Sequence, residues 1–155
     1  MLKAVSNSGP IIHLHEINQL KLFDLFGDLI IPVSVSNEIK GIDISRVKTV
    51  DVKPDEIKGF VEQIKEFNLH TAEIDAMCLA DKTNVVFLTD DLHARKAAIK
   101  LNIKVHGSLG IISLAYKKGI LILDEAKQQI NNLYNNSTLF LTKALVEIAM
   151  QKLES

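Results

Sequence analysis

Short apolar runs alternate along the chain with longer stretches of helical spacing. Residues 29–31 and 85–88 are continuously apolar, which is typical of strands buried on both faces of a parallel sheet. Residues 54–67 repeat apolar side chains every three or four positions, which predicts a helix with one buried face. The same pattern predicts strands at 2–5 and 103–106, an edge strand or extended connection at 46–52, and helices at 32–40, 71–81, 92–101 and 108–118.

Turn-forming residues divide these segments. A loop of small polar residues at 6–9 precedes Pro10, which suits the first turn of a helix. Residues 11–26 predict two short helices that break near Asn18, with Gly27 as a C-terminal cap. The tail at 124–153 predicts two more helices, broken at 135–137. Alternating strands and helices favour an α/β fold with a parallel sheet.

Length and composition restrict the class of protein. The chain has 155 residues, of which 47% are hydrophobic, so one globular domain with a sizeable core is expected. The net charge of −1 excludes a globally basic, nucleic-acid-attracting protein and permits self-association. Cys78 is the only cysteine, which fits a reducing compartment. No apolar run approaches the roughly 18 residues that a membrane span needs, so we expect a cytoplasmic protein without a membrane partner.

Polar residues follow the predicted strands at positions where they meet in an open parallel sheet. Asn7 follows the first strand, Asp90 and Asp91 follow the central strand, and Glu38 and Glu73 lie in flanking helices. Ligands bind beyond the carboxyl ends of such strands. Oxygen ligands suit Mg²⁺ or Mn²⁺, which can activate water and stabilise a leaving oxygen in phosphodiester hydrolysis. The carboxylates repel one another until a cation neutralises them.

Each acidic residue also has a simpler interpretation. Asp90 and Asp91 precede a helix, where aspartate is a common N-cap. Glu73 in a first turn complements the helix dipole, whereas Glu38 near a helix end opposes it. Asp75 lies about 200° around the helix from Glu73 and is expected to be solvated. His13 and His15 diverge on their helix and make no zinc pair, so core or surface positions are expected.

Five motifs, in this order, resemble those of PIN domains over residues 1 to about 120. They are residues 5–12 (VSNSGPII) with Asn7, residues 32–38 (PVSVSNE) with Glu38, residues 72–76 (AEIDA) with Glu73, residues 87–95 (FLTDDLHAR) with Asp90 and Asp91, and residues 105–111 (VHGSLGI). The sequence departs from the family at Asn7, where most active members have Asp, and at His70 and Thr71, which replace the usual Gly-Glu. An amide oxygen can bind a hard cation but brings no charge.

The resemblance implies a PIN-like, ribonuclease H-like three-layer domain with four or five parallel strands flanked by helices. On this reading residues 1–120 form the PIN domain, and residues 121–155 form a C-terminal helical extension packed on the same domain. The resemblance also implies a Mg²⁺- or Mn²⁺-dependent endoribonuclease that cleaves single-stranded RNA. Prokaryotic relatives are often VapC-like toxins, which are usually dimeric and neutralised by a small antitoxin, so a homodimer or higher homo-oligomer is expected.

The residues expected to act follow from these motifs. Glu38, Glu73 and Asp91 are the expected catalytic carboxylates and metal ligands, with Asn7 as a neutral fourth ligand and Asp90 in support. Ser8, Arg95 and Lys96 are expected to contact RNA, although a solvated helix face explains the two cations equally well.

Two other classes of function remain for comparison. One is an inactive PIN module that binds RNA or a partner protein, as the neutral Asn7 suggests. The other is a small-molecule-binding α/β domain of flavodoxin or receiver type, which the lack of a glycine-rich phosphate loop disfavours.

Overall fold

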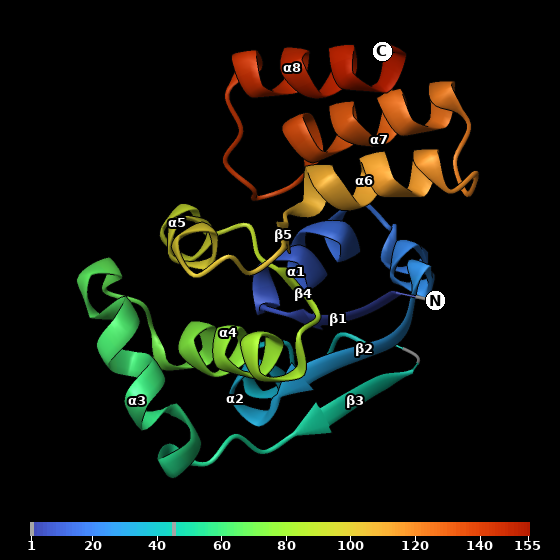
Figure 1. The fold of residues 1–155 in the computed structure, drawn as a ribbon. Helices are drawn as coiled ribbons and strands as arrows, with labels where there is room; N and C mark the ends of the chain where they lie inside the picture. Colours follow the sequence, from blue (N-terminus) through green and yellow to red (C-terminus); the bar gives the residue numbers. More distant parts are fainter. Residues whose placement is uncertain (1, 45) are drawn as a thin grey trace.

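The computed structural model describes residues 2–44 and 46–155, and these contain a five-stranded sheet in which every pairing is parallel (Figure 1). The strand order is β3-β2-β1-β4-β5. The strands are β1 (Leu2–Ser6), β2 (Phe26–Pro32), β3 (Val47–Val50), β4 (Val86–Leu88) and β5 (Val105–His106). The predicted α/β fold with a four- to five-stranded parallel sheet is confirmed, and the segment predicted at 46–52 contains an edge strand.

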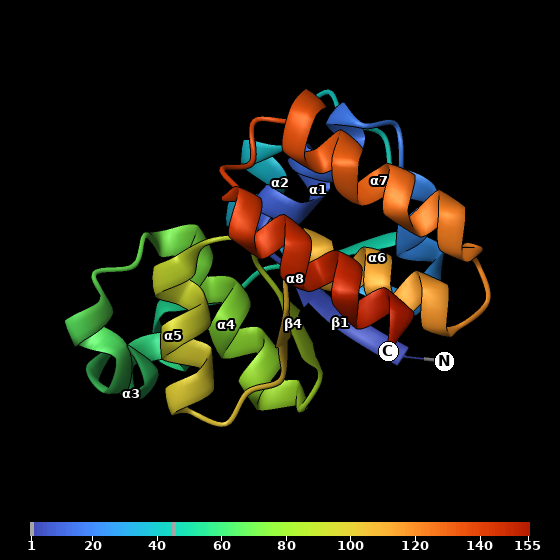
Figure 2. The same ribbon diagram turned by 90° about the horizontal axis from the view of Figure 1, so that it is seen from above.

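Helices cover both faces of the sheet, which gives three layers (Figures 1 and 2). The helices α2, α3 and α4 lie on one side, while α1 and α6 lie on the other, with α7 and α8 stacked beyond α6. The α-helices are α1 (Ser8–Glu16), α2 (Val33–Glu38), α3 (Pro54–Ile64), α4 (Thr71–Thr83), α5 (Leu92–Lys100), α6 (Ser108–Lys117), α7 (Leu123–Asn136) and α8 (Lys143–Glu154), and the 3-10 helices are η1 (Leu20–Leu25) and η2 (Lys65–Phe67).

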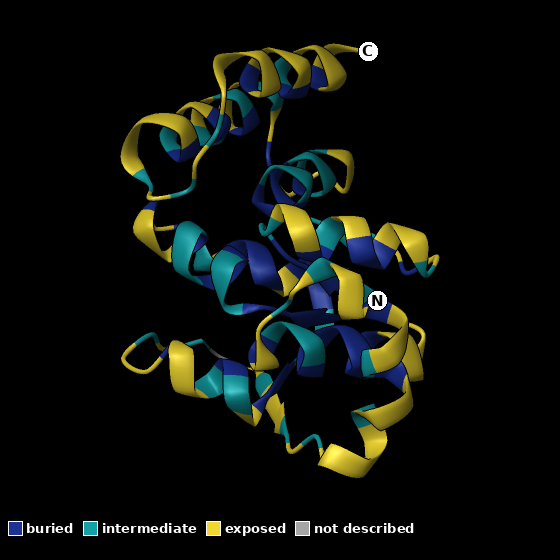
Figure 3. Cartoon of the chain, turned by 90° about the vertical axis from the view of Figure 1, so that its left-hand side faces the viewer, coloured by how far each residue is buried: buried dark blue, intermediate teal, exposed yellow. Residues whose placement is uncertain are grey.

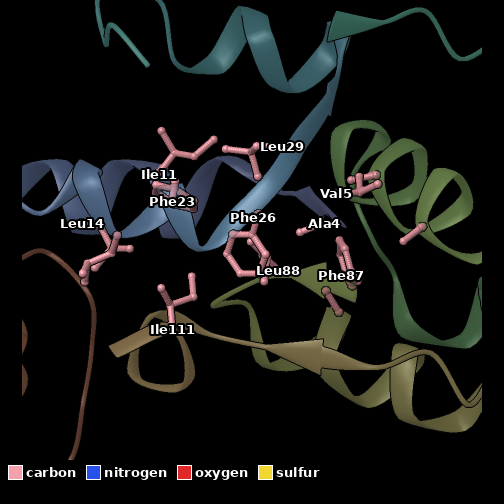
Figure 4. Packing of buried hydrophobic residues seen from close by; sticks show 14 of the residues in the cluster. Ala4, Val5, Ile11, Leu14, Phe23, Phe26, Leu29, Phe87, Leu88 and Ile111 are labelled. Atoms are coloured by element: carbon pink, nitrogen blue, oxygen red, sulfur yellow. The ribbon is translucent and has the colours of Figure 1, made fainter. Parts of the chain in front are cut away.

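The core lies on both faces of the central strands, as the continuous apolar run at 85–88 predicted. Phe87 and Leu88 are fully buried, and because successive residues of a strand point to opposite faces they enter different layers. Figure 4 shows Leu88 with Phe26 and Ile111 on the α6 side, and Val5 toward α4. In Figure 3 the sheet and the inward helix faces are buried, while the outward faces are exposed. This packing fixes the strand ends that carry the polar residues.

One predicted helix end is wrong. Gly27 was expected to cap a helix, but it lies inside β2, because parallel pairing with β1 begins at Phe26. The predicted break near Asn18 is present, since this residue has a left-handed φ of 59° and separates α1 from η1. Local pattern located the break but missed the strand start, which depends on a partner strand far away in the sequence.

The two C-terminal helices pack on the rest of the fold through α6, which contacts both α7 and α8. The connection between α7 and α8 is also fastened to α1, because the backbone N–H and the hydroxyl of Thr138 both donate to Glu16 Oε1 at 2.9 Å. Across residues 2–44 and 46–155, no helix combines the length and apolar character needed to traverse a lipid bilayer.

Candidate functional site

A cavity of about 300 Å³ lies at the carboxyl ends of β1 and β4. Strand β1 is flanked by β2 on one side and β4 on the other, so the strand order reverses at β1 and leaves a crevice there. We call this cavity the acidic pocket. Six of the eight predicted site residues line it. All of its lining residues are Asn7, Ser8, Gly9, His13, Glu38, His70, Glu73, Thr89, Asp90 and Asp91. The structure therefore brings together side chains that lie up to 84 positions apart between Asn7 and Asp91.

Asn7 presents an unsatisfied oxygen in this pocket. Its backbone N–H donates to the Leu88 carbonyl at 2.8 Å, and its side-chain Nδ2 donates to Thr89 Oγ1 at 2.7 Å. Asn7 is only 5% exposed, and Oδ1 has no hydrogen-bond partner among the described residues. A buried amide oxygen without a partner is costly, so this atom is available to a ligand that donates or carries positive charge.

Three carboxylates concentrate negative charge beside Asn7. Glu73, in the first turn of α4, is half-buried and accepts a hydrogen bond from the His70 backbone N–H at 3.0 Å. Burial raises the pKa of Glu73 above its usual value, and the nearby charges of Asp91 and Glu38 raise it further. Glu38 is the last residue of α2, where the helix dipole disfavours a negative charge. A cation in the pocket would relieve this repulsion.

Asp91 has a structural role and also faces the pocket. It is the N-cap of α5, and its Oδ2 accepts a hydrogen bond from the Ala94 backbone N–H at 2.8 Å. Thr89 Oγ1 accepts from the Asp91 backbone N–H at 3.2 Å, so the same hydroxyl orients both Asn7 and Asp91. The capping interpretation is confirmed for Asp91, and it leaves this side chain at the pocket wall.

Asp90 is held by the beginning of α6 instead of capping α5. Its Oδ1 accepts from the Ser108 backbone N–H, and its Oδ2 accepts from Ser108 Oγ, both at 2.6 Å. Nδ1 of His13 lies 2.7 Å from Oδ2. A Cβ added at Gly107 would approach Asp90 Oδ1 to 2.8 Å, so only glycine leaves room for this contact. Both oxygens of Asp90 are thus engaged by protein groups, which makes Asp90 a positioning residue.

Besides Gly9, which has no side chain, three residues that line the pocket were not predicted from the sequence. His13 was assigned to core or surface, yet it lies one helical turn after Gly9 on α1 and reaches Asp90. Its spacing from Gly9 was the available signal. Thr89 was part of a motif but received no role, and His70 was seen only as a departure from the family pattern. The role of Thr89 depends on its contact with Asn7 from the adjacent strand, and that of His70 on its position at the start of α4.

The expectation that Asp75 is solvated is wrong. Asp75 is 7% exposed, and its Oδ2 accepts a hydrogen bond from Ser34 Oγ at 2.7 Å. Ser34 lies on α2, so this contact fastens α2 to α4 and supports the helix that carries Glu38. Asp75 lies about 200° around α4 from Glu73, but α2, and not solvent, covers that side of the helix.

Arg95 and Lys96 do not line the acidic pocket. Arg95 lines a second, apolar groove between α5, α6 and α8, and Lys96 is exposed on α5. Ser8 does line the acidic pocket. Of the residues expected to contact RNA, only Ser8 is therefore placed beside the carboxylates.

The raised pKa of Glu73 predicts a pH-dependent effect of its charge on stability. Because the folded state holds the Glu73 proton more tightly than the unfolded state, ionisation of Glu73 above its usual pKa of 4.5 lowers the free energy of unfolding. We expect Glu73→Gln to stabilise the protein at pH 7 in chelator, and the gain to shrink as the pH falls through the raised pKa of the folded state and to be absent below the usual pKa of 4.5. Urea unfolding of both proteins at several pH values checks this; a gain that does not depend on pH contradicts it.

The donors of the acidic pocket fit an open cation site. Within the part of the chain that the structure describes, no group of three His, Cys, Asp or Glu side chains is arranged to hold a metal ion. Mg²⁺ does not require one, because it keeps several waters and is bound through one or two carboxylates together with substrate phosphates. The unpartnered oxygen of Asn7 and the mutually repelling carboxylates of Glu73, Asp91 and Glu38 supply the oxygen donors that such an ion prefers.

The fold and the site define the class of protein: a parallel α/β domain with an acidic pocket where the strand order reverses. The sequence also matches the model of a known family. Residues 3–155 match the model of the family described as DUF3368, PIN domain. The chain therefore belongs to the PIN domain family, as its motifs suggested. No curated protein matches the chain. One similar solved structure is that of VapBC2 from Rickettsia felis bound to a DNA fragment from their promoter, with 13% identity, coverage of 68% of this chain and 98% of that chain, and a TM-score of 0.48.

Proposed function

We propose that the protein is a Mg²⁺- or Mn²⁺-dependent endoribonuclease that cleaves single-stranded RNA. The observation that carries this proposal is the unpartnered Oδ1 of Asn7 in a pocket with three carboxylates. Neither feature is favourable in the absence of a cation, and membership of the PIN domain family is consistent with nuclease chemistry. The oxygen-only donor set favours Mg²⁺ or Mn²⁺ over Zn²⁺.

The roles of the residues follow from their contacts. Glu73, Asp91 and Glu38 would hold the ion together with the Asn7 amide oxygen, and the bound ion would supply positive charge to the scissile phosphate and lower the pKa of water. Thr89 keeps Asn7 and Asp91 in place through its hydroxyl. Asp90 supports the pocket by joining α6 and His13 to the end of β4.

The proposed substrate contacts extend from this pocket. Ser8 lines the pocket and is suited to bind a phosphate oxygen, while Arg95 and Lys96 of α5 would supply positive charge to phosphates further along the RNA. We also propose a cytoplasmic location, a homodimer or higher homo-oligomer, and a small antitoxin as a partner. The family resemblance supports these three proposals.

Cleavage of a mixed single-stranded RNA pool tests the proposal. Purified protein should cleave the pool with Mn²⁺ or Mg²⁺, lose this activity in EDTA, and regain it when the ion is restored. The protein carrying Glu38→Gln and Glu73→Gln together should not cleave under any of these conditions. Equal cleavage by the wild type and this double variant would point to a contaminating nuclease and contradict the assignment.

A second candidate function, an inactive PIN module that binds RNA or a protein, is favoured by the neutral Asn7. Replacement of Asn7 by Asp separates the two candidates, because the Thr89 hydroxyl can donate to a carboxylate in place of accepting from the amide. In an enzyme, Asn7→Asp should tighten Mn²⁺ binding by about tenfold or more, since ligand charge tunes cation affinity over orders of magnitude. It should also raise cleavage.

The matched control adds the same charge elsewhere. Asn135→Asp lies on the exposed side of α7 and should change neither Mn²⁺ affinity nor cleavage. A gain in affinity without any turnover at Asn7→Asp would favour the binding module over the enzyme.

A further inference from the structure

An apolar groove lies next to the acidic pocket and shares the lining residue Asp90 with it. It has a volume of about 610 Å³ and is formed by the start of α5, the first half of α6, α8 and the connection between α7 and α8. Asp90 borders both cavities, so one residue forms part of the wall between them. The proposed nuclease function makes no use of the apolar side chains in this groove.

Large apolar side chains are exposed along the groove. Phe140, in the connection before α8, is 86% exposed, and Leu92, Leu145 and Ile148 are also exposed. Exposed apolar side chains gathered around one concave surface mark a binding site more often than isolated ones do. Leu145 and Ile148 lie three positions apart on α8, so they form one face of that helix.

The charge at the rim of the groove is positive. Arg95 and Lys152 line it, and neither forms an ion pair within residues 2–44 and 46–155. The only carboxylate among its described lining residues is Asp90, whose oxygens are engaged by Ser108 and His13. Burial lowers the pKa of His106 in this wall, and Arg95, Lys117 and Lys104 lower it further, which is consistent with a positive field.

We propose that this groove binds an acidic amphipathic helix of a partner protein. A concave apolar floor accepts the apolar stripe of such a helix, whose side chains recur at i, i+3 or i+4, and i+7. Acidic side chains beside that stripe would pair with Arg95 and Lys152. A second copy of this chain fits less well, because a twofold contact through this face would bring Arg95 and Lys152 toward their own copies. An apolar floor also disfavours RNA.

A displayed library of helices, about 18 residues long and randomised on their surfaces, tests the proposal. Selection on the wild-type protein should enrich sequences with an apolar stripe flanked by Asp and Glu. The enriched peptides should lose affinity for Phe140→Ser and for Lys152→Glu by at least about tenfold, as expected for a hot-spot side chain. Phe140 is so exposed that its replacement leaves the core intact.

Matched controls lie outside the groove. Ile122→Ser removes an apolar side chain that is 64% exposed, and Lys118→Glu reverses an exposed charge; both should bind the peptides as the wild type does. Failure to enrich any helix, enrichment of basic helices, or equal binding to all variants would overturn the proposal. So would sedimentation showing a wild-type oligomer that Phe140→Ser dissociates, because a second copy would then fill the groove. Peptide binding is measured without RNA, so its outcome is independent of the proposed nuclease activity.

Discussion

Replacing Asp91 by Asn is expected to reduce metal-stimulated RNA cleavage by at least about 100-fold, the upper end of the loss caused by removing even a supporting group of a metal site. The reason is specific to this position. Asp91 and Glu73 line the same pocket, and the charge of Asp91 is one of those that raise the pKa of Glu73. The amide keeps the shape of the side chain but removes its charge.

The fold should survive this substitution. Asp91 caps α5 through Oδ2, and Asn is about as good an N-cap as Asp. We expect the free energy of unfolding, measured with urea, to change by less than about 0.5 kcal/mol. Unchanged cleavage by a folded Asp91→Asn protein would show that Asp91 has no part in the reaction.

Replacing Asp90 by Ala is expected to lower the free energy of unfolding by about 3 kcal/mol, because buried donors lose a charged acceptor. Its side chain is 6% exposed and accepts from both the backbone and the hydroxyl of Ser108, with His13 also in contact. The loss should be visible in urea unfolding with chelator present, since it does not depend on a bound ion.

Two other aspartate substitutions serve as controls for Asp90→Ala. Asp91→Ala removes a single capping bond and should cost about 1 kcal/mol. Asp81→Ala, at an exposed position on α4, should stay within about 0.5 kcal/mol of the wild type. If Asp91→Ala were as destabilising as Asp90→Ala, the distinction between a positioning carboxylate and a pocket carboxylate would fail.

The sheet could be predicted from the sequence because its signal is local. Continuous apolar runs at 29–31 and 85–88 mark strands buried on both faces, and both lie in strands next to β1. Of the eight site residues predicted from the motifs, six line one pocket. Gly27 was misassigned because local spacing does not report where a parallel partner strand begins.

The internal organisation of the pocket could not be predicted, because its contacts join distant segments. The His13–Asp90 contact spans 77 positions, and the Asp90–Ser108 contacts span 18. The burial of Asp75 likewise depends on Ser34 of a helix 41 positions away. Residue type shows that these side chains are polar, but neither residue type nor position on a helix shows which partner each side chain contacts.

The central claim is that the acidic pocket holds a divalent cation through Asn7, Glu73, Asp91 and Glu38. Calorimetric titration of chelator-treated protein with Mn²⁺ tests it most directly, because binding is measured without any assumption about the RNA. We predict a saturable heat for the wild type, loss of at least about tenfold in affinity for Asp91→Asn, and unchanged binding for Asn135→Asp. A folded wild-type protein that gives no binding heat and no Mn²⁺-dependent rise in unfolding temperature, or one whose affinity is the same in Asp91→Asn, would contradict the claim.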